Sequence, residues 1–206
     1  CTIELGENSN FEKKLISKDL NNKEVTIQLQ VKNDEVVNKP TGEIMLVLDN
    51  SDSMNNTVDG TKTRKELIFD SAKTLVSNLL KDNEELKIGI VSFSTNTDIS
   101  KEGSSEDANL VSSLSNDISK LNNAISNIKA DGPRTNLESG LDLASGQFTK
   151  TDNNKYMIVL TDGVPNVALN YDKSYYSDDV ISKTKSKLQQ LKQSNINVIT
   201  MLTGID

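Results

Sequence analysis

Hydrophobic and polar residues alternate along the first part of the chain. In residues 24–31, EVTIQLQV, every second side chain is apolar. Such alternation predicts an antiparallel strand with one buried face and one face in water. A shorter alternation over residues 1–5 does not define a strand by itself, and residues 34–42, which include Pro40, are typical of a connector.

The pattern changes near Gly42, where continuous apolar runs begin to alternate with amphipathic segments. Four such runs are typical of strands covered on both faces: residues 43–48, 86–93, 156–160 and 197–202. Helical spacing predicts helices with these inward positions: Leu67, Ile68, Ala72, Leu75, Val76, Leu79 and Leu80; Leu114, Ile118, Leu121, Ile125 and Ile128; Leu137, Leu141, Ala144 and Phe148; Val180, Ile181, Thr184, Leu188 and Leu191. Ser115 is the expected cap of the second helix. Residues 94–113 are polar and fit either a short edge strand or a loop.

Strands that alternate with helices predict an α/β fold, with a doubly wound, mostly parallel sheet flanked by helices. A short N-terminal β element precedes it. We therefore divide the chain into a β-rich segment of a stalk-like domain, residues 1–42, and an α/β domain, residues 43–206. Ligands of such sheets bind beyond the carboxyl ends of the strands, so functional residues are expected there.

The first buried strand runs directly into the polar stretch DNSDS. Asp49, Ser51 and Ser53 alternate along it, so their side chains can converge on one point. They offer only oxygen atoms, which are the ligands that Mg²⁺ prefers. Taken alone, Asp and Ser at such a turn also fit helix caps.

Two further oxygen donors are expected at the same edge of the sheet. Asp162 follows the third buried strand in LTDGVPN, and Thr135 precedes a helix in DGPRTNLESG. Each has a second interpretation: TDG is also an ordinary turn, and Thr135 could cap its helix in a capping box with Glu138. Together with Asp49, Ser51 and Ser53 they make a candidate metal site drawn from three loops.

These three motifs, in this order, resemble the metal-ion-dependent adhesion site of von Willebrand factor A domains. The resemblance covers residues 43–206 and implies a bound Mg²⁺, Mn²⁺ or Ca²⁺ held by Asp49, Ser51, Ser53, Thr135 and Asp162. Asp52 stands where the family commonly has glycine, and Asp tolerates a left-handed backbone better than most residues. Asp52 and Asn136 are further candidates for contact with a ligand. The family normally continues beyond Asp206, so we expect a domain that is truncated at its C-terminus.

Composition narrows the functional classes. The net charge is −7 and the 23 basic residues are dispersed, which argues against a nucleic-acid partner. No apolar run approaches the ~20 residues of a membrane span. Histidine is absent, and neither a phosphate-binding loop nor a nucleophile elbow occurs. The EF-hand pattern fails at Met54 and Gly60, and an aspartyl phosphotransferase would want a second carboxylate where Ser51 stands. We therefore expect a protein that is not an enzyme.

The resemblance implies adhesion, in which the cation coordinates an acidic group of a host or matrix protein such as collagen. With the N-terminal strand, the chain is similar to Gram-positive pilus-tip and surface adhesins, which implies an extracellular location on the cell wall or pilus. Lys13 or Lys14 could then form an isopeptide bond, and Cys1 is open to several roles. The alternatives are an intracellular adaptor that docks an ATPase through its metal and a structural pilus subunit.

Overall fold

The computed structural model describes residues 2–6, 9–19, 24–33, 41–58, 60–81, 83–149, 153–170, 175 and 177–202. The chain divides into two compact units, Cys1–Lys39 and Pro40–Asp206. Most of the expected connector, residues 34–40, lies outside the described residues.

The first unit is a three-stranded antiparallel sheet with the order β1-β2-β3. Its strands are β1 (Thr2–Gly6), β2 (Ser9–Asp19) and β3 (Glu24–Asn33). The alternating run at 24–31 lies in β3, in a sheet separate from that of the second unit, as predicted. The pattern does not predict β2, because a register shift between Leu15 and Ser17 interrupts its alternation. Lys13 and Lys14 lie on β2, but the structure does not describe their side chains, so the isopeptide bond stays a prediction.

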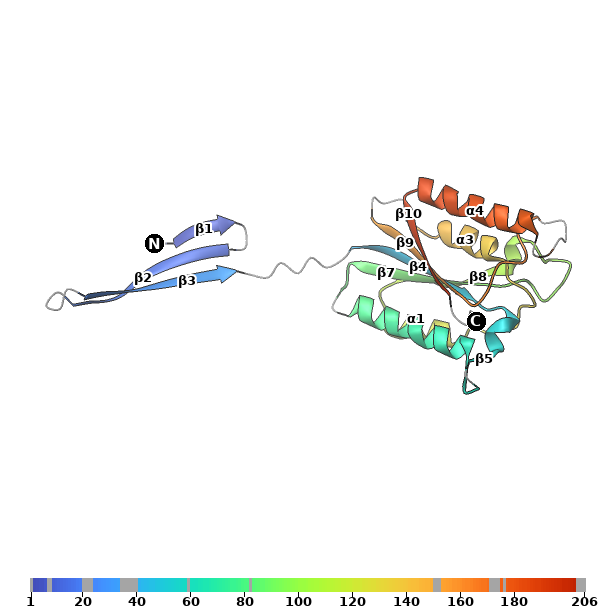
Figure 1. Ribbon diagram of the computed structural model, residues 1–206, viewed down its shortest axis with the longest axis horizontal. Coiled ribbons are helices and arrows are strands. Elements are labelled where there is room, and N and C mark those ends of the chain that lie inside the picture. The colour runs from blue at the N-terminus through green and yellow to red at the C-terminus, as the bar shows by residue number, and fades with distance from the viewer. Residues whose placement is uncertain are drawn as a thin grey trace. The chain divides into compact units, whose positions relative to one another are not determined.

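The second unit is built around a five-stranded sheet with the order β10-β9-β4-β7-β8 (Figure 1). The strands are β4 (Gly42–Asp49), β7 (Leu86–Phe93), β8 (Ala108–Ser115), β9 (Lys155–Thr161) and β10 (Ile196–Leu202). All neighbours pair in parallel except β8, which is antiparallel to β7. From β4 the chain builds the sheet outward through β7 and β8, and then continues on the other side with β9 and β10. The strand order therefore reverses between β4 and β9, which is where ligands of such sheets bind.

In the described part of this unit, four helices cover the two faces of the sheet. They are α1 (Arg64–Leu80), α2 (Ile118–Ser126), α3 (Leu137–Ser145) and α4 (Asp178–Gln193). Figure 1 shows α1 on one side of the sheet and α3 with α4 on the other. Shorter elements are the 3₁₀ turns η1 (Asp52–Asn55) and η2 (Ser105–Asp107) and the strands β5 (Thr57–Val58) and β6 (Lys62–Thr63).

The central strand β4 contributes side chains to both halves of the core. Ile44, Leu46 and Leu48 pack with apolar residues of α1 and α2. Met45 and Val47 pack on the opposite face, with α3 and α4. All eight residues of β4 are buried, which explains why residues 44–48 are all apolar rather than alternating. The same burial on both faces was predicted for β10, and there it is wrong.

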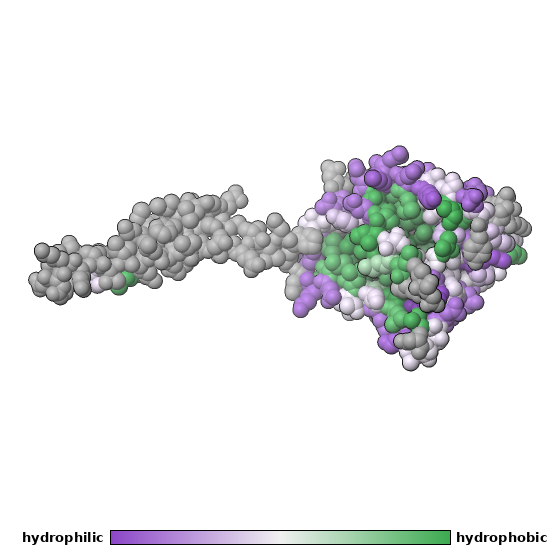
Figure 2. All heavy atoms as spheres, viewed as in Figure 1, coloured by the Kyte–Doolittle hydropathy of each residue, from purple (hydrophilic) through white to green (hydrophobic). Residues whose placement is uncertain are grey.

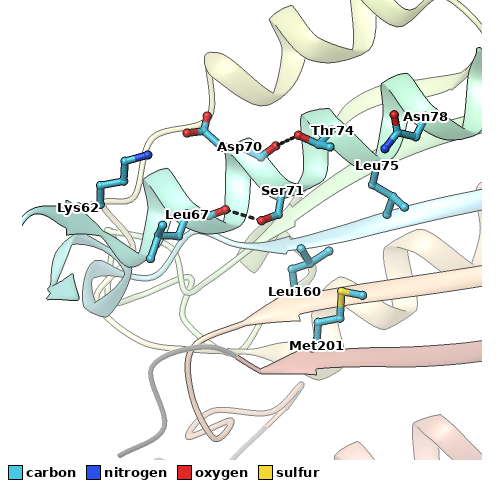
Figure 3. A pocket seen from close by; sticks show the side chains of 9 residues that line it. All are labelled: Lys62, Leu67, Asp70, Ser71, Thr74, Leu75, Asn78, Leu160 and Met201. Carbon is cyan, nitrogen blue, oxygen red and sulfur yellow. Dashed lines mark hydrogen bonds between the residues drawn. The ribbon is translucent and has the colours of Figure 1, made fainter. Parts of the chain in front are cut away.

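The outer strand β10 is covered only near the start of one face, and Leu202 at the end of that face is 53% exposed. Ile196 and Val198 belong to the core beside α3 and α4. Ile199 and Met201 face the side of α1 and are each 48% exposed, because β10 is the edge strand and α1 does not reach over it. Met201, Leu160 and residues of α1 line a groove of about 430 Å³ (Figure 3). An apolar surface is visible on this side in Figure 2.

Two helix starts differ from the predictions. The helix expected from Leu114 begins only at Ile118, because Leu114 is part of the edge strand β8. Its cap is Asp117, which accepts a hydrogen bond from the Lys120 amide (2.9 Å), and not Ser115. The α3 cap is Asn136 rather than Thr135, and Glu138 accepts its hydrogen bond from the Leu169 amide instead of completing a capping box.

Candidate metal centre

The turn after β4 is held by backbone hydrogen bonds to two neighbouring segments. The Asn50 amide donates to the Phe93 carbonyl at the end of β7 (2.9 Å), and the Asp52 amide donates to the Gly132 carbonyl (2.7 Å). A Cβ added at Gly132 would lie 2.0 Å from the Ser94 Oγ, so only glycine fits this close approach. The glycine thereby lets the loop that carries Thr135 lie against Ser94 and Thr95 after β7, while its backbone bonds to the turn after β4.

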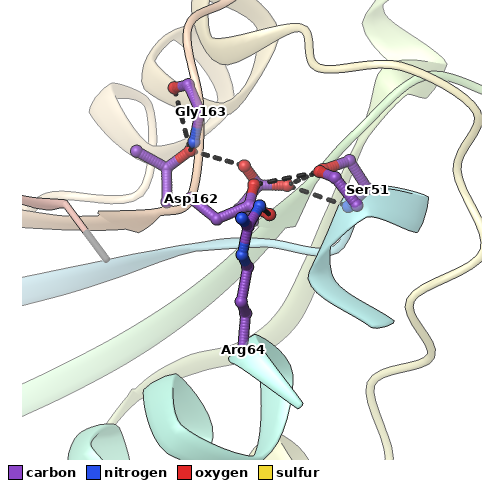
Figure 4. Close-up of polar contacts among 7 residues, drawn as sticks. Ser51, Arg64, Asp162 and Gly163 are labelled. Carbon is purple, nitrogen blue, oxygen red and sulfur yellow. Dashed lines mark hydrogen bonds and ion pairs between the residues drawn. The ribbon is translucent and has the colours of Figure 1, made fainter. Parts of the chain in front are cut away.

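Four of the five predicted site residues are joined by hydrogen bonds. The Asp49 Oδ1 atom accepts from the amide (2.8 Å) and the hydroxyl (2.6 Å) of Ser51. The Ser51 and Ser53 hydroxyl oxygens lie 3.1 Å apart, and the Ser53 hydroxyl donates to the Asp162 Oδ1 atom (3.0 Å). Figure 4 labels Ser51 and Asp162, two members of this arrangement. The carboxyl ends of β4 and β9 thus contribute one continuous row of oxygen atoms.

Thr135, the fifth predicted residue, reaches the site from the loop before α3. Its amide donates to the Asn166 side-chain oxygen (2.8 Å), and its carbonyl accepts from the Asn166 amide (3.1 Å). It lines the same hollow as Ser51, Ser53 and Asp162, with a volume of about 370 Å³. The three loops named by the sequence motifs therefore meet at one cavity.

The carboxylates of Asp49 and Asp162 lie close enough to repel each other. Asp49 is completely buried, and burial raises the pKa of its carboxyl group. Hydrogen bonds from Ser51 and Thr161 act in the opposite direction, and the nearby charge of Asp162 adds to the increase in the pKa. A cation beside Asp49 would favour its ionised form.

The spacing of the oxygen atoms fits a small divalent cation. Neighbouring ligands of an octahedral Mg²⁺ with bonds of ~2.0–2.1 Å lie about 2.9 Å apart. The separations of 3.1 Å between the two serine hydroxyls and 3.0 Å between Ser53 and Asp162 are close to that edge length. Within the described ranges, no group of three or more His, Cys, Asp or Glu side chains could hold a metal. Any cation at this site therefore depends on the hydroxyl groups as well as on the two carboxylates.

Three residues around the site were not predicted. Thr161 donates its hydroxyl to the Asp49 Oδ2 atom (2.5 Å), and Asn166 holds the backbone of Thr135. Arg64, the first residue of α1, lies 3.0 Å from the Asp162 Oδ2 atom through its Nη1 (Figure 4). The position of Thr161 directly before Asp162 was a signal in the sequence, whereas the reach of Arg64 depends on the packing of α1.

The two additional ligand candidates have different surroundings. Asp52 is exposed in η1 and accepts a hydrogen bond from the Asn55 amide group (3.1 Å). Its φ is not positive, so the left-handed backbone expected at this position does not occur. Asn136 is completely buried, and its side chain bonds with Asp107 and the Ser139 amide. Asn136 is therefore a structural residue of the α3 start.

A second buried aspartate lies at the same edge of the sheet. Asp107 accepts from the amides of Asn96 and Gly103 and from the Asn136 side chain, each at 2.8 Å. We call Asp107 and these three donors the loop cluster, and Asp49, Ser51, Ser53, Thr161 and Asp162 the oxygen cluster. Burial raises the pKa of Asp107, although its three hydrogen bonds oppose the increase. The loop cluster fixes Asn136 and, next to it, Thr135.

The comparisons with known proteins agree with this architecture. Residues 44–164 match the family model for the von Willebrand factor type A domain. No curated protein matches the chain. None of the helices in the described part of the chain combines the length and apolar character that crossing a membrane requires.

Several solved structures have the same fold. The pilus adhesin SpaC from Lactobacillus rhamnosus GG, in its open conformation, is 20% identical with a TM-score of 0.65; the match covers 97% of this chain and 29% of SpaC. Three N-terminal domains of the type V pili tip protein Mfa5 from Porphyromonas gingivalis are 18% identical with a TM-score of 0.54, covering 76% of this chain and 26% of that one. Proximal thread matrix protein 1 from the mussel byssus is 18% identical with a TM-score of 0.58, covering 80% and 38%. The chain thus spans less than a third of the length of SpaC.

Proposed function

The chain belongs to the family of von Willebrand factor type A domains, and from this premise we propose that it is a non-catalytic adhesion domain. It binds an acidic group of a partner protein through a divalent cation, Mg²⁺ or Mn²⁺. Ca²⁺ is a weaker candidate, because it takes six to eight oxygen ligands. The proposed location is the bacterial surface, in a pilus or a cell-wall protein, and the proposed partner is a host or matrix protein such as collagen.

The observation that carries the proposal is the row of oxygen atoms at the strand ends beside a cavity. Ser51 and Ser53 would be direct ligands, because a hydroxyl can donate to a carboxylate and still present a lone pair. Thr135 would complete the set from the cavity wall, and Asp49 and Asp162 would supply negative charge, directly or through water. Thr161 and Asn166 hold Asp49 and Thr135 in position.

The chemistry of this ligand set favours an acidic partner. When bound, the cation would supply an open coordination position for a carboxylate oxygen. Asp49 and Asp162 are the two carboxylates of the oxygen cluster, and Arg64 adds a positive charge beside them. These side chains would therefore leave the loaded site positively charged, which favours a negatively charged ligand.

The pilus setting is supported by the kind of protein that shares this architecture. SpaC is a pilus adhesin and Mfa5 is a pilus tip protein, and the SpaC match extends over 97% of the chain. That extent includes the small β sheet as well as the α/β unit, an arrangement suited to a domain carried on a β-rich stalk.

The test is binding of the protein to immobilised matrix proteins, collagen included, with and without EDTA. We expect binding in Mg²⁺ or Mn²⁺, loss in EDTA and recovery when the cation is restored. Ser53→Ala and Asp162→Asn should each weaken binding about 10- to 100-fold, as losses in a metal shell do. Asp162→Asn keeps the size of this buried side chain, so that the fold is preserved.

Asp98→Ala is the matched control, because it removes an exposed carboxylate from a nearby loop. It should bind like the unmodified protein. A partner that binds Asp162→Asn at full strength in EDTA would show that adhesion does not use this site.

A further inference from the structure

The positively charged side chain of Arg64 lies where it would compete with the divalent cation proposed for this site. Its Nη1 atom lies 3.0 Å from the Asp162 Oδ2 atom, across 98 positions of sequence. The side chain of Asp162 is 1% exposed and that of Arg64 is 22% exposed. An ion pair this well shielded is screened much less by salt than a surface pair.

The stability of α1 does not explain an arginine at this position. Arg64 is the first residue of the helix, where the helix dipole favours negative rather than positive side chains. The start of α1 already has a complete capping box made by Thr63 and Glu66. The guanidinium of Arg64 contacts Asp162, and this contact accounts for a positive charge at the position.

The chain has two arginines, and both line the cavity. Arg134 is neutralised by Glu102, whose side chain is 1% exposed, at 2.8 Å. It also stacks on the Tyr175 ring, with 4.0 Å from its Cζ atom to the ring centroid. Arg64 instead pairs with a carboxylate of the oxygen cluster, and a guanidinium does not lose its charge at any physiological pH.

Both oxygen atoms of Asp162 are engaged by this arrangement. Oδ1 accepts from the Ser53 hydroxyl and Oδ2 from Arg64. We infer that Arg64 is a tethered counter-ion of the oxygen cluster, which holds Asp162 when no divalent cation is bound and opposes the binding of one. The inference rests on the proposed cation site and adds how its affinity is set.

Two effects of Arg64 act against a divalent cation. Its positive charge repels the cation at close range, and its hydrogen bond to Asp162 must be shared or broken. In return, Arg64 stabilises the cation-free protein by neutralising a buried carboxylate. The site should therefore load only at cation concentrations higher than its oxygen ligands alone would require.

The experiment titrates the folded protein with MnCl₂ by isothermal calorimetry and compares Arg64→Gln with the unmodified chain. We expect the dissociation constant of Arg64→Gln to fall about tenfold, which corresponds to about 1.4 kcal/mol. Arg64→Lys should give an intermediate value, because an ammonium keeps the charge but loses the planar geometry that matches a carboxylate. Lys73→Gln, which removes a partly exposed positive charge from the same helix, should leave the constant unchanged.

Thermal unfolding provides a second readout. In EDTA, Arg64→Gln should unfold at a lower temperature than the unmodified chain. Saturating Mn²⁺ should raise the unfolding temperature of Arg64→Gln by more than it raises that of the unmodified chain. Circular dichroism at 20 °C checks that Arg64→Gln is folded. If it is not, Arg64→Lys replaces it in the comparison with the unmodified chain.

The possible results separate the two proposals. Binding of Mn²⁺ by the unmodified chain tests the cation site itself. If the unmodified chain binds and Arg64→Gln binds no more tightly, the cation site stands and the role of Arg64 is refuted. If only Arg64→Gln binds, the role of Arg64 is supported and the unmodified chain is not a cation-dependent adhesin. If neither binds, both proposals fail.

Discussion

Two buried aspartates at one edge of the sheet have different hydrogen-bond partners. Asp107 in the loop cluster faces three N–H groups, two from the backbone and one from the Asn136 side chain. Asp49 in the oxygen cluster faces one backbone N–H and two hydroxyl groups, those of Ser51 and Thr161. Burial raises the pKa of both carboxyl groups, so burial does not distinguish them.

The difference lies in what the partners can do. An N–H group only donates, so its partner must stay an acceptor, whereas a hydroxyl can rotate and either donate or accept. The loop cluster is therefore a fixed structural contact that shapes the start of α3. The oxygen cluster can rearrange around a ligand without leaving a buried group unsatisfied. Partner chemistry, rather than the aspartate itself, is what separates a structural carboxylate from a candidate ligand.

The largest effect is expected for Asp107→Asn. Wherever the new NH₂ group points, it meets an N–H donor, so buried hydrogen bonds are lost and donors face each other. The free energy of unfolding should fall by about 3 kcal/mol. Urea denaturation followed by far-ultraviolet circular dichroism measures this, since the chain has no tryptophan. A loss no larger than that of Asp98→Asn, at an exposed aspartate, would contradict a structural role for the loop cluster.

The matched change, Asp49→Asn, should act on cation binding instead. Its NH₂ group can face Thr161, whose hydroxyl turns round to accept a hydrogen bond. In EDTA the free energy of unfolding should therefore change by less than about 1 kcal/mol, because a buried charge disappears as one hydrogen bond is rearranged. Affinity for Mn²⁺ should fall about 100-fold. A destabilisation equal to that of Asp107→Asn would remove the distinction between the two clusters.

The smallest effect is a pH dependence of stability in EDTA. The pKa of Asp49 in the folded protein lies above its ordinary value of 3.8. As the pH falls, the Asp49 carboxylate is therefore protonated at a higher pH in the folded state than in the unfolded state. The contribution of Asp49 to stability is therefore greatest below 3.8 and is lost as the pH rises through the folded pKa. Relative to Asp49→Asn, the unmodified chain should become less stable between pH 4 and pH 7. A difference that grows in favour of the unmodified chain over this range would show the opposite sign.

That the candidate residues lie together could be predicted from sequence, because each motif stands directly beside a recognisable element. Asp49 and Asp162 follow apolar strands, and parallel strands bring their carboxyl ends to one edge, so Ser51, Ser53 and Asp162 had to lie close together. The contacts of Asn136 and Arg64 could not be predicted. Asn136 points at Asp107 because of how two loops fold, and Arg64 reaches Asp162 because of where α1 packs.

The apolar runs in β4 and β10 show more generally what a sequence pattern can and cannot predict. Both are mostly apolar, and the sequence by itself determined that each is a strand, that helices lie between them and that a polar stretch with oxygen donors follows the first. Only the tertiary structure decided that β4 is central and fully buried while Ile199 and Met201 of β10 are half exposed. An apolar run predicts a strand without an alternating polar face. Whether both faces of that strand are buried depends on its place in the sheet and on which strands the helices cover.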